Sequence, residues 1–373
     1  MKHLLLISCS LLLLTACQTE NSHASNTEAN SQPTSQSQSQ ERSLTNQNET
    51  TTSQAATESQ DKPSQEESKV SDYYPLTANY QAHFQGEGNE FSSFDRVYDF
   101  IEDNYVQSRT DNSGTSVMEI VRVGEDRVDL ITTQPEFYIR ENYIPRFKDQ
   151  AAEKTLLKAP LEVGTNWDNS DEHREITALD QDIKLANGDS VPSIEVTVTG
   201  EGMVSKEYYA KDYGLVYEET VMDGEDAPIA SSRLETMTTD GWEETITVTQ
   251  VNDQGDDYYE ENVDVPIETN TRMRDEFQKL LSGANDLQAL LPEGTKINAL
   301  HTNNLDHSTV YVDFSPEIET IKGSTASQTS YHAIFKTLAD YYHADQIVAT
   351  VNNEPIEIDQ VGPLPQPYII SQN

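Results

Sequence analysis

Few residues of this chain have the types and spacing that catalysis needs. Its 373 residues contain no GxSxG nucleophile elbow, no HExxH zinc motif, no P-loop and no dinucleotide fingerprint. His301 and His307 flank an expected hairpin, but Asp306 is the only carboxylate beside them, which makes a poor zinc site. We therefore predict no catalytic residue, no cofactor and no metal site, and a protein that is not an enzyme.

Carboxylates are the remaining candidates for chemistry, because Asp and Glu together number 65. Asp313 stands at the end of an expected strand, where a carboxylate more often accepts hydrogen bonds from loop amides than it catalyses. The acidic stretches 168–172 and 256–261 have the composition of calcium ligands but lack the spacing of an EF-hand loop. A carboxylate pair for glycoside hydrolysis is neither indicated nor excluded by the sequence.

The N-terminus carries a short apolar segment that ends at a cysteine. Lys2 and His3 precede the apolar residues 4–16, and Leu14-Thr15-Ala16-Cys17 closes the segment. Because this run is well short of the ~20 residues that span a bilayer, residues 1–16 are predicted to be an export signal. Cys9 would be removed with the signal, so the mature chain would contain no disulfide.

The residues around Cys17 resemble the lipobox of bacterial lipoproteins. The resemblance implies that Cys17 is acylated on its sulfur, with palmitate-type chains, and becomes the mature N-terminus. Two acyl chains, at roughly 0.8 kcal/mol per buried methylene, hold a protein stably on a membrane. We expect an extracytoplasmic protein that is lipid-anchored to the cell membrane through Cys17. The alternative is an ordinary signal peptide in which the cysteine occurs by chance.

Residues 17–71 are predicted to be a disordered tether. They are rich in Ser, Thr, Gln, Asn and Glu, with Leu44 as the only leucine of the stretch before Ser71. Such a segment buries too little apolar surface to offset the entropy of ordering. The whole chain has 24 basic residues and a net charge of −41, so nucleic acid is not an expected partner.

Residues 72–240 are predicted to form an antiparallel all-β domain. Short segments alternate apolar and polar residues and are separated by turn signals, a pattern typical of half-buried strands. The segments are 117–123, 127–132, 193–199, 203–209, 214–221 and 230–237. Their regular spacing favours a curved meander that closes toward a barrel or a sandwich.

Paired tyrosines raise the question of sugar binding in this region. Tyr73-Tyr74 and Tyr208-Tyr209 could stack on sugar rings, but neighbouring strand residues face opposite sides, so one of each pair is expected in the core. Residues 73–76 and 209–216 resemble all-β domains of bacterial envelope lipoproteins. That resemblance implies a fold and no reaction.

Residues 241–355 change to a mixed pattern that predicts a small α+β domain, followed by a tail over 356–373. Strands are expected at 244–251, 261–267, 296–300, 309–314 and 346–351. Helices are expected after a cap at Asn270 or Thr271, ending at Gly283, and over 327–342. We expect both helices to cover one face of a sheet.

Several motifs of this region occur in the order found in a known family. Residues 291–297 (LPEGTKI), 312–315 (VDFS), 280–283 (LLSG) and Thr337-Leu338 resemble the sporulation and germination domain called GerMN. The resemblance implies a secreted envelope lipoprotein and brings no catalytic residues. This chain has one copy of the domain, whereas spore-germination lipoproteins usually have two, which weakens the transfer of a spore role.

We therefore expect a multidomain, non-enzymatic surface lipoprotein that binds or organises a cell-envelope component, with a possible link to sporulation or germination left open. Its expected partners are peptidoglycan or another envelope protein. Two alternatives remain: a peptidoglycan hydrolase that uses two carboxylates, and an extracytoplasmic solute-binding receptor.

Overall fold

The computed structural model describes residues 68–225, 227–302, 305, 307–321, 324–358 and 362–370. Cys17, the predicted export signal and all but the last residues of the predicted tether lie outside these ranges. None of the helices in the described ranges is both long enough and apolar enough to cross a membrane.

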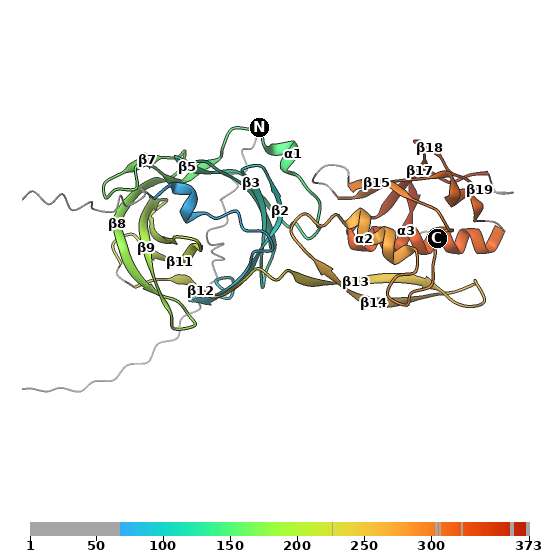
Figure 1. Cartoon of the computed structure of the whole chain (residues 1–373), viewed down its shortest axis with the longest axis horizontal. Helices are drawn as coiled ribbons and strands as arrows, with labels where there is room; N and C mark the ends of the chain where they lie inside the picture. The colour runs from blue at the N-terminus through green and yellow to red at the C-terminus, as the bar shows by residue number, and fades with distance from the viewer. Residues whose placement is uncertain are drawn as a thin grey trace, which may run out of the picture. The chain divides into compact units, whose positions relative to one another are not determined.

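Twelve strands form one barrel-like antiparallel sheet, as the alternating segments predict, and Figure 1 shows them around a common centre. The sheet order is β6-β5-β4-β3-β2-β1-β12-β11-β10-β9-β8-β7, so two meanders are joined where the first strand pairs with the last. The strands are β1 (Gln81–Glu87), β2 (Phe94–Glu102), β3 (Tyr105–Asn112), β4 (Ser116–Val123), β5 (Arg127–Pro135), β6 (Lys154–Lys158), β7 (Asn166–Asp168), β8 (His173–Lys184), β9 (Ser190–Gly200), β10 (Met203–Ala210), β11 (Gly214–Met222) and β12 (Ala230–Thr238). The short helix α1 (Ile144–Phe147) lies between β5 and β6.

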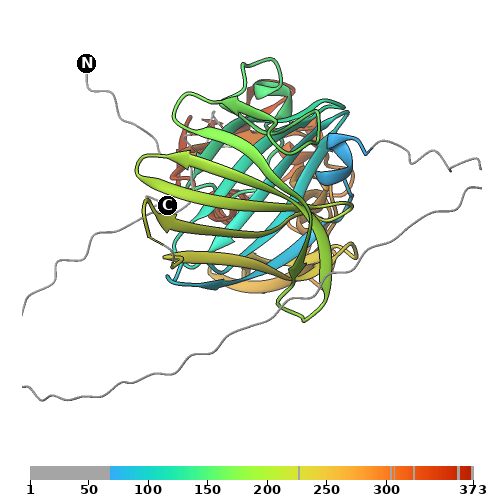
Figure 2. The same cartoon turned by 90° about the vertical axis from the view of Figure 1, so that its left-hand side faces the viewer.

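Side chains connect the two edges of this sheet. Trp167 in the edge strand β7 donates from Nε1 to the backbone oxygen of Thr155 in β6 (2.9 Å). The backbone nitrogen of Thr155 donates in turn to Asn169 Oδ1 (2.9 Å). Lys154 and Glu172 form an ion pair at 3.3 Å across the same edges. These contacts close the curved sheet, which Figure 2 shows from another side, without a β6–β7 backbone ladder.

The N-terminal segment lies across one end of this sheet. The 3-10 helix η1 (Val70–Tyr73) and the next residue bury Val70 and Tyr74 in the core of the barrel. Lys69 pairs with Glu125 in the β4–β5 turn (3.1 Å), and Asp72 pairs with Lys211 in the β10–β11 turn (3.1 Å). The segment is therefore attached to one turn in each of the two meanders of the sheet.

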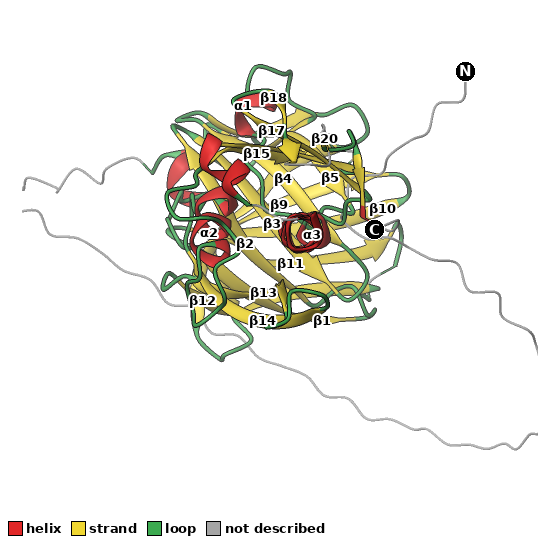
Figure 3. Cartoon of the chain, turned by 90° about the vertical axis from the view of Figure 1, so that its right-hand side faces the viewer, coloured by secondary structure: helices red, strands yellow, loops and turns green. Residues whose placement is uncertain are grey.

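The described part of the C-terminal region contains two larger sheets and a short two-stranded one, which differs from the single helix-covered sheet face expected from the sequence. β13 (Trp242–Val251) pairs only with β14 (Tyr258–Ile267), while β15 (Ile297–Thr302), β16 (Thr309–Phe314) and β17 (Gln346–Val351) form a second sheet with β18 (Glu354–Pro355). β16 and β17 are parallel, and the 3-10 helix η2 (Pro316–Thr320) and α3 (Ser324–Tyr341) connect them. Figure 3 shows α3 end-on among these strands.

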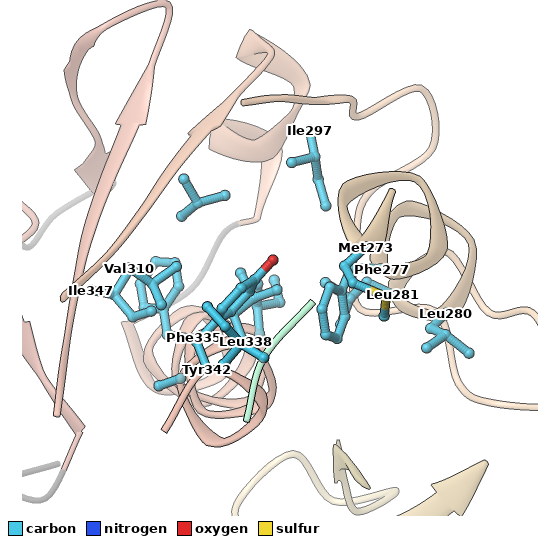
Figure 4. Packing of buried hydrophobic residues seen from close by; sticks show 14 of the residues in the cluster. Met273, Phe277, Leu280, Leu281, Ile297, Val310, Phe335, Leu338, Tyr342 and Ile347 are labelled. Atoms are coloured by element: carbon cyan, nitrogen blue, oxygen red, sulfur yellow. The ribbon is translucent and has the colours of Figure 1, made fainter. Parts of the chain in front are cut away.

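α3 packs against β13 as well as against the second sheet, and its Thr337 Oγ1 accepts a hydrogen bond from the backbone of Thr249 (3.0 Å). The core beside it contains Phe335, Leu338 and Tyr342 of the α3 segment (Figure 4). Because both strands and helix supply apolar residues to one cluster, the helix is covered on two sides. Periodicity identifies such a helix but not the number of sheets that it contacts.

Helix α2 (Met273–Leu281) buries the four residues expected on one face: Met273, Phe277, Leu280 and Leu281 (Figure 4). The expected cap at Asn270 or Thr271 is wrong, because Arg272 is the N-cap residue and makes no capping bond with its side chain. Asn270 instead hydrogen-bonds both backbone groups of Ile101 in β2 (2.9 and 3.1 Å). Its side chain is used to join two regions of the chain.

Part of the predicted tail is also paired. β19 (Glu357–Ile358) pairs with β20 (Gly362–Pro363), and β21 (Tyr368–Ile369) pairs with β17. Leu364 and Tyr368 are buried. These residues therefore contribute to the core of the C-terminal region.

One apolar cluster includes residues of the barrel and of the C-terminal region. Phe100, Met118, Ile120 and Ile139 on the barrel side belong to the same cluster as Phe277 and Phe335. The strands β2–β5 are thus packed on both faces. One face contributes to the core inside the barrel, and the other packs against the C-terminal region. The predicted division into 72–240 and 241–355 stays a prediction about folding units.

Candidate functional site

Asp313 is held by hydrogen bonds at the end of β16. Its Oδ1 accepts from Thr350 Oγ1 (2.6 Å) and from the backbone nitrogen of Asn353 (2.8 Å), and its Oδ2 accepts from Asn298 Nδ2 (2.9 Å). Burial raises the pKa of this carboxyl, but the three hydrogen bonds outweigh it and lower the pKa below its usual value. A carboxylate that stays ionised and fully engaged suits the expected structural role and cannot serve as a general acid.

His301 and His307 do not form a metal site with other described residues. The His301 ring stacks on Tyr311 with centroids 5.3 Å apart, and His307 contacts the edge of Phe137 at 5.5 Å. Asp306, the carboxylate considered with them, lies outside the described residues. Within the described ranges, no group of three or more His, Cys, Asp or Glu side chains could hold a metal ion.

The acidic stretch 168–172 is used within the fold. Asp168 binds His173 (2.7 Å), and Glu172 binds both Arg174 (2.6 Å) and Lys154 (3.3 Å). In the stretch 256–261, the backbone nitrogen of Asp256 donates to Asn252 Oδ1 (3.0 Å) and shapes the β13–β14 turn. Both acidic stretches therefore make contacts within the fold.

The paired tyrosines are mainly packing residues. Tyr208 and Tyr209 are both buried, as is Tyr74, while Tyr73 is half-buried. The expectation of one core residue in each pair therefore understates the burial of Tyr208-Tyr209. Tyr208 is stacked on Tyr217 at 5.4 Å, and Tyr209 donates to Glu207 (2.5 Å). Neither is available to stack on a sugar ring.

The sequence did not reveal a group of charged residues inside the barrel. Arg96 of β2, Glu119 of β4 and Glu218 of β11 alternate with neighbours that face outward, and all three influence one another electrostatically. The Arg96 guanidinium lies over the rings of Phe94 (5.3 Å) and Phe84 (6.0 Å), and its Nε donates to Thr110 Oγ1 (3.0 Å). Strand pairing places Tyr98, Ser108 and Glu119 side by side. This cluster is the candidate functional site.

Burial and charge determine protonation at this site. Burial, the nearby Glu207 and to a smaller extent Glu119 raise the pKa of Glu218 to about 7, while Arg96 and a Ser232 hydroxyl partly offset the shift. Burial lowers the pKa of Arg96, but Glu119 and surrounding tyrosines outweigh it, so the guanidinium stays charged. The interior therefore carries a permanent cation beside carboxylates, one of which titrates near neutral pH.

A second charged group in the barrel is fully paired. Arg174 binds Glu207 through two hydrogen bonds (2.9 and 2.8 Å), and Glu207 also accepts from Tyr209. Arg174 further donates to Glu172 (2.6 Å) and to the backbone oxygen of Leu156 (2.9 Å). This bidentate pair fixes β8 against β10 and leaves little capacity for a ligand.

The C-terminal region is similar to a known family. Residues 244–357 match the family model Germane, described as sporulation and spore germination. The matched residues include the motifs at 291–297 and 312–315, in agreement with the expected GerMN resemblance. The comparison with curated proteins gives no match.

Solved structures with similar parts come from three bacteria. The tandem GerMN domains of the sporulation protein GerM from Bacillus subtilis share 18% identity at a TM-score of 0.28, over 34% of this chain and 46% of that one. A protein described as a lipoprotein from Clostridium perfringens shares 16% identity at a TM-score of 0.23, over 35% of this chain and 89% of that one. An exported protein with a YmcC-like fold from Bacteroides fragilis shares 11% identity at a TM-score of 0.28, over 43% and 95%. This chain thus spans less than half of the GerM structure.

Proposed function

We propose that this chain is a non-enzymatic, extracytoplasmic lipoprotein that binds or organises a component of the cell envelope, peptidoglycan or another envelope protein. The observation that carries the proposal is the match of residues 244–357 to a family described by sporulation and spore germination. The hydrogen bonds of Asp313 support the non-enzymatic part of the proposal, because its two oxygens already accept three hydrogen bonds within the fold. Cys17 would supply the lipid anchor.

A pull-down with purified peptidoglycan tests this proposal. The full chain should be retained on the insoluble polymer, or capture an envelope protein, and release no soluble muropeptides. Retention should weaken as salt rises if charged contacts contribute. Failure to associate with peptidoglycan or with any envelope protein would overturn the proposal.

The hydrolase alternative has one observation in its favour. Burial raises the pKa of Glu218 to about 7, Glu119 faces the same interior, and glycosidases use a pair of carboxyl groups. The segment Lys69–Tyr74 lies across one end of the barrel, however, and a polymeric glycan requires an open cleft. Muropeptide release that disappears in Glu218→Gln, with the fold retained, would favour the hydrolase.

A further inference from the structure

Charged residues inside the barrel are partly accessible to solvent. Arg96, Glu119 and Glu218 face inward, yet each keeps part of its surface accessible. Along β11, the inward-facing residues change from Val216, which is fully buried, to Met222, which is 45% exposed. Met203, the strand partner of Met222, is half-buried. The side chains on this face of β11 therefore become more accessible toward the end of the barrel opposite the segment Lys69–Tyr74.

Polar groups in this space lack protein partners. The buried Ser108 Oγ, between Tyr98 and Glu119 in register, has no hydrogen-bond partner among the described residues. Among the described residues, Arg96 donates a hydrogen bond only from Nε, to Thr110, and no carboxylate forms an ion pair with its guanidinium. Buried polar groups are almost always satisfied, so an unpartnered hydroxyl next to the partly accessible Glu119 indicates that water or a ligand completes it.

The charges define the chemistry that would fit. A guanidinium binds a carboxylate through two parallel hydrogen bonds, and Glu119 and Glu218 would attract an ammonium group. The rings of Phe84, Phe94 and Tyr98 are buried beside these charges, so the charged groups are the part of the interior that a ligand would contact. A phosphate or a fatty acid would have to approach two carboxylates without a compensating cation of its own. A ligand with both charges avoids that repulsion.

We propose that the barrel interior binds a small zwitterion, a free amino acid or a short peptide with free termini, whose carboxylate contacts Arg96 and whose ammonium group contacts Glu119 and Glu218. Ser108 would complete the site as a hydroxyl donor or acceptor. This site depends only on the barrel and is independent of the envelope partner proposed for the whole chain. A failed peptidoglycan pull-down would therefore leave it standing.

Calorimetric titration of the purified full chain with the dipeptide alanyl-alanine tests the proposal. Two matched probes each lack one charge: N-acetyl-alanyl-alanine has no ammonium group, and alanyl-alanine amide has no carboxylate. We expect the free dipeptide to bind and each capped probe to bind about tenfold more weakly or worse, the loss expected for a charge-assisted contact. Equal binding of the three probes, or no binding of the dipeptide at about 10 mM, would overturn the proposal.

Variants locate the site within the chain. Arg96→Gln should weaken dipeptide binding about tenfold or more, and Ser108→Ala, a smaller change, should weaken it severalfold. Glu219→Gln is the matched control, because Glu219 follows Glu218 but faces outward and accepts from Tyr217 (2.8 Å). If Arg96→Gln fails to fold, Ser108→Ala and the capped probes still decide. Unchanged affinity in Ser108→Ala together with an unchanged preference for the free dipeptide in a folded Arg96→Gln protein would place binding elsewhere and overturn the proposal.

Discussion

Arg109 on β3 donates a 2.8 Å hydrogen bond to Glu244 on β13, which joins the wall of the barrel to the first strand of the C-terminal region. Both side chains are largely buried, and the buried Asp99 lies 3.5 Å from the Nε atom of Arg109. Arg140 pairs with Asp99 and also donates to backbone oxygens of Glu268 and Thr271. The ion pair of Arg109 with Glu244 and the hydrogen bonds of Arg140 to two backbone oxygens thus cross the junction.

Loss of one partner in this network should be costly. Glu244→Gln leaves Arg109 with a weaker partner inside the protein, and we expect the free energy of unfolding to fall by about 3 kcal/mol. Chemical denaturation measures the change. The control is Asp126→Asn, which alters an exposed 3.5 Å contact with Arg127 and should change stability by less than about 0.5 kcal/mol. Equal effects of the two substitutions would contradict a structural role for the network.

Asp313→Asn should destabilise the protein by about 1–3 kcal/mol at neutral pH, because the amide cannot accept all three hydrogen bonds. The pKa of Asp313 is lowered by folding, so the stability that its ionised form contributes is present above the unfolded pKa of 3.8. That contribution is lost as the pH falls through the folded pKa. Denaturation at pH 7 and at pH 3 should show a difference between variant and wild type that shrinks in acid; a difference that grows in acid would contradict this account.

Glu218 predicts a pH dependence of the opposite sign. Its pKa rises from 4.5 to about 7 on folding, so stability present at low pH is lost as the pH rises through that window. The groups that face it are Glu207 on β10, Glu119 on β4, Arg96 on β2 and Ser232 on β12. Glu218→Gln should be more stable than wild type at pH 8 by about 1–3 kcal/mol and nearly equal to it at about pH 4. Thermal unfolding at the two pH values measures this, and a constant difference would argue against titration of Glu218.

Gly283 follows α2 with a φ of +92°, in the position where helices commonly end with glycine. An added Cβ would lie 3.2 Å from both Ala289 Cβ and the backbone oxygen of Leu287. Gly283→Ala should therefore cost more than the ~1 kcal/mol expected from the positive φ alone. Gly255→Ala measures the cost of the positive φ alone, because Gly255 has a φ of +73° and no atom lies within 4 Å of its added Cβ. A smaller loss at Gly283 than at Gly255 in urea denaturation would contradict the crowding argument.

Cys17→Ser tests the predicted anchor. The substitution should abolish acylation and move the protein from the membrane fraction to the soluble fraction or the medium, with a lower mass. Fractionation followed by mass spectrometry measures both effects. An unchanged mass with the variant still bound to membranes would show that Cys17 carries no lipid.

Sequence patterns predicted strands where apolar and polar residues alternate and failed where buried charged residues interrupt the alternation. The run 117–123 was recognised from its alternation, although Met118 and Ile120 face the C-terminal region and Glu119 faces the barrel interior. β2 was not predicted, because Asp95, Arg96 and Asp99 disrupt its pattern. Asp99 is stabilised by Arg109 and Arg140, and no local rule identifies partners that folding brings together from other elements.

The role of Asp313 could be inferred from its place at a strand end, and α2 from the spacing of four apolar residues. The cluster of Arg96, Glu119 and Glu218 could not be inferred from the sequence, because an alternating pattern assigns a charged residue to the solvent face by default. In a closed sheet, a polar residue can face inward and still contact water. Only the register of β2, β3 and β4, together with the electrostatic influence of Arg96 and Glu119 on Glu218 of β11, shows that these side chains share one space.

The attachment of η1 to two separate turns has a mechanical consequence. A pull on the chain ahead of Lys69 would act through Glu125 on the β4–β5 turn and through Lys211 on the β10–β11 turn at the same time. Such a load is shared between two strand pairs, and the sheet is not unzipped one strand at a time from a free edge. Tension would first have to extract the buried Val70 and Tyr74, so the first event under load would be the opening of that end of the barrel.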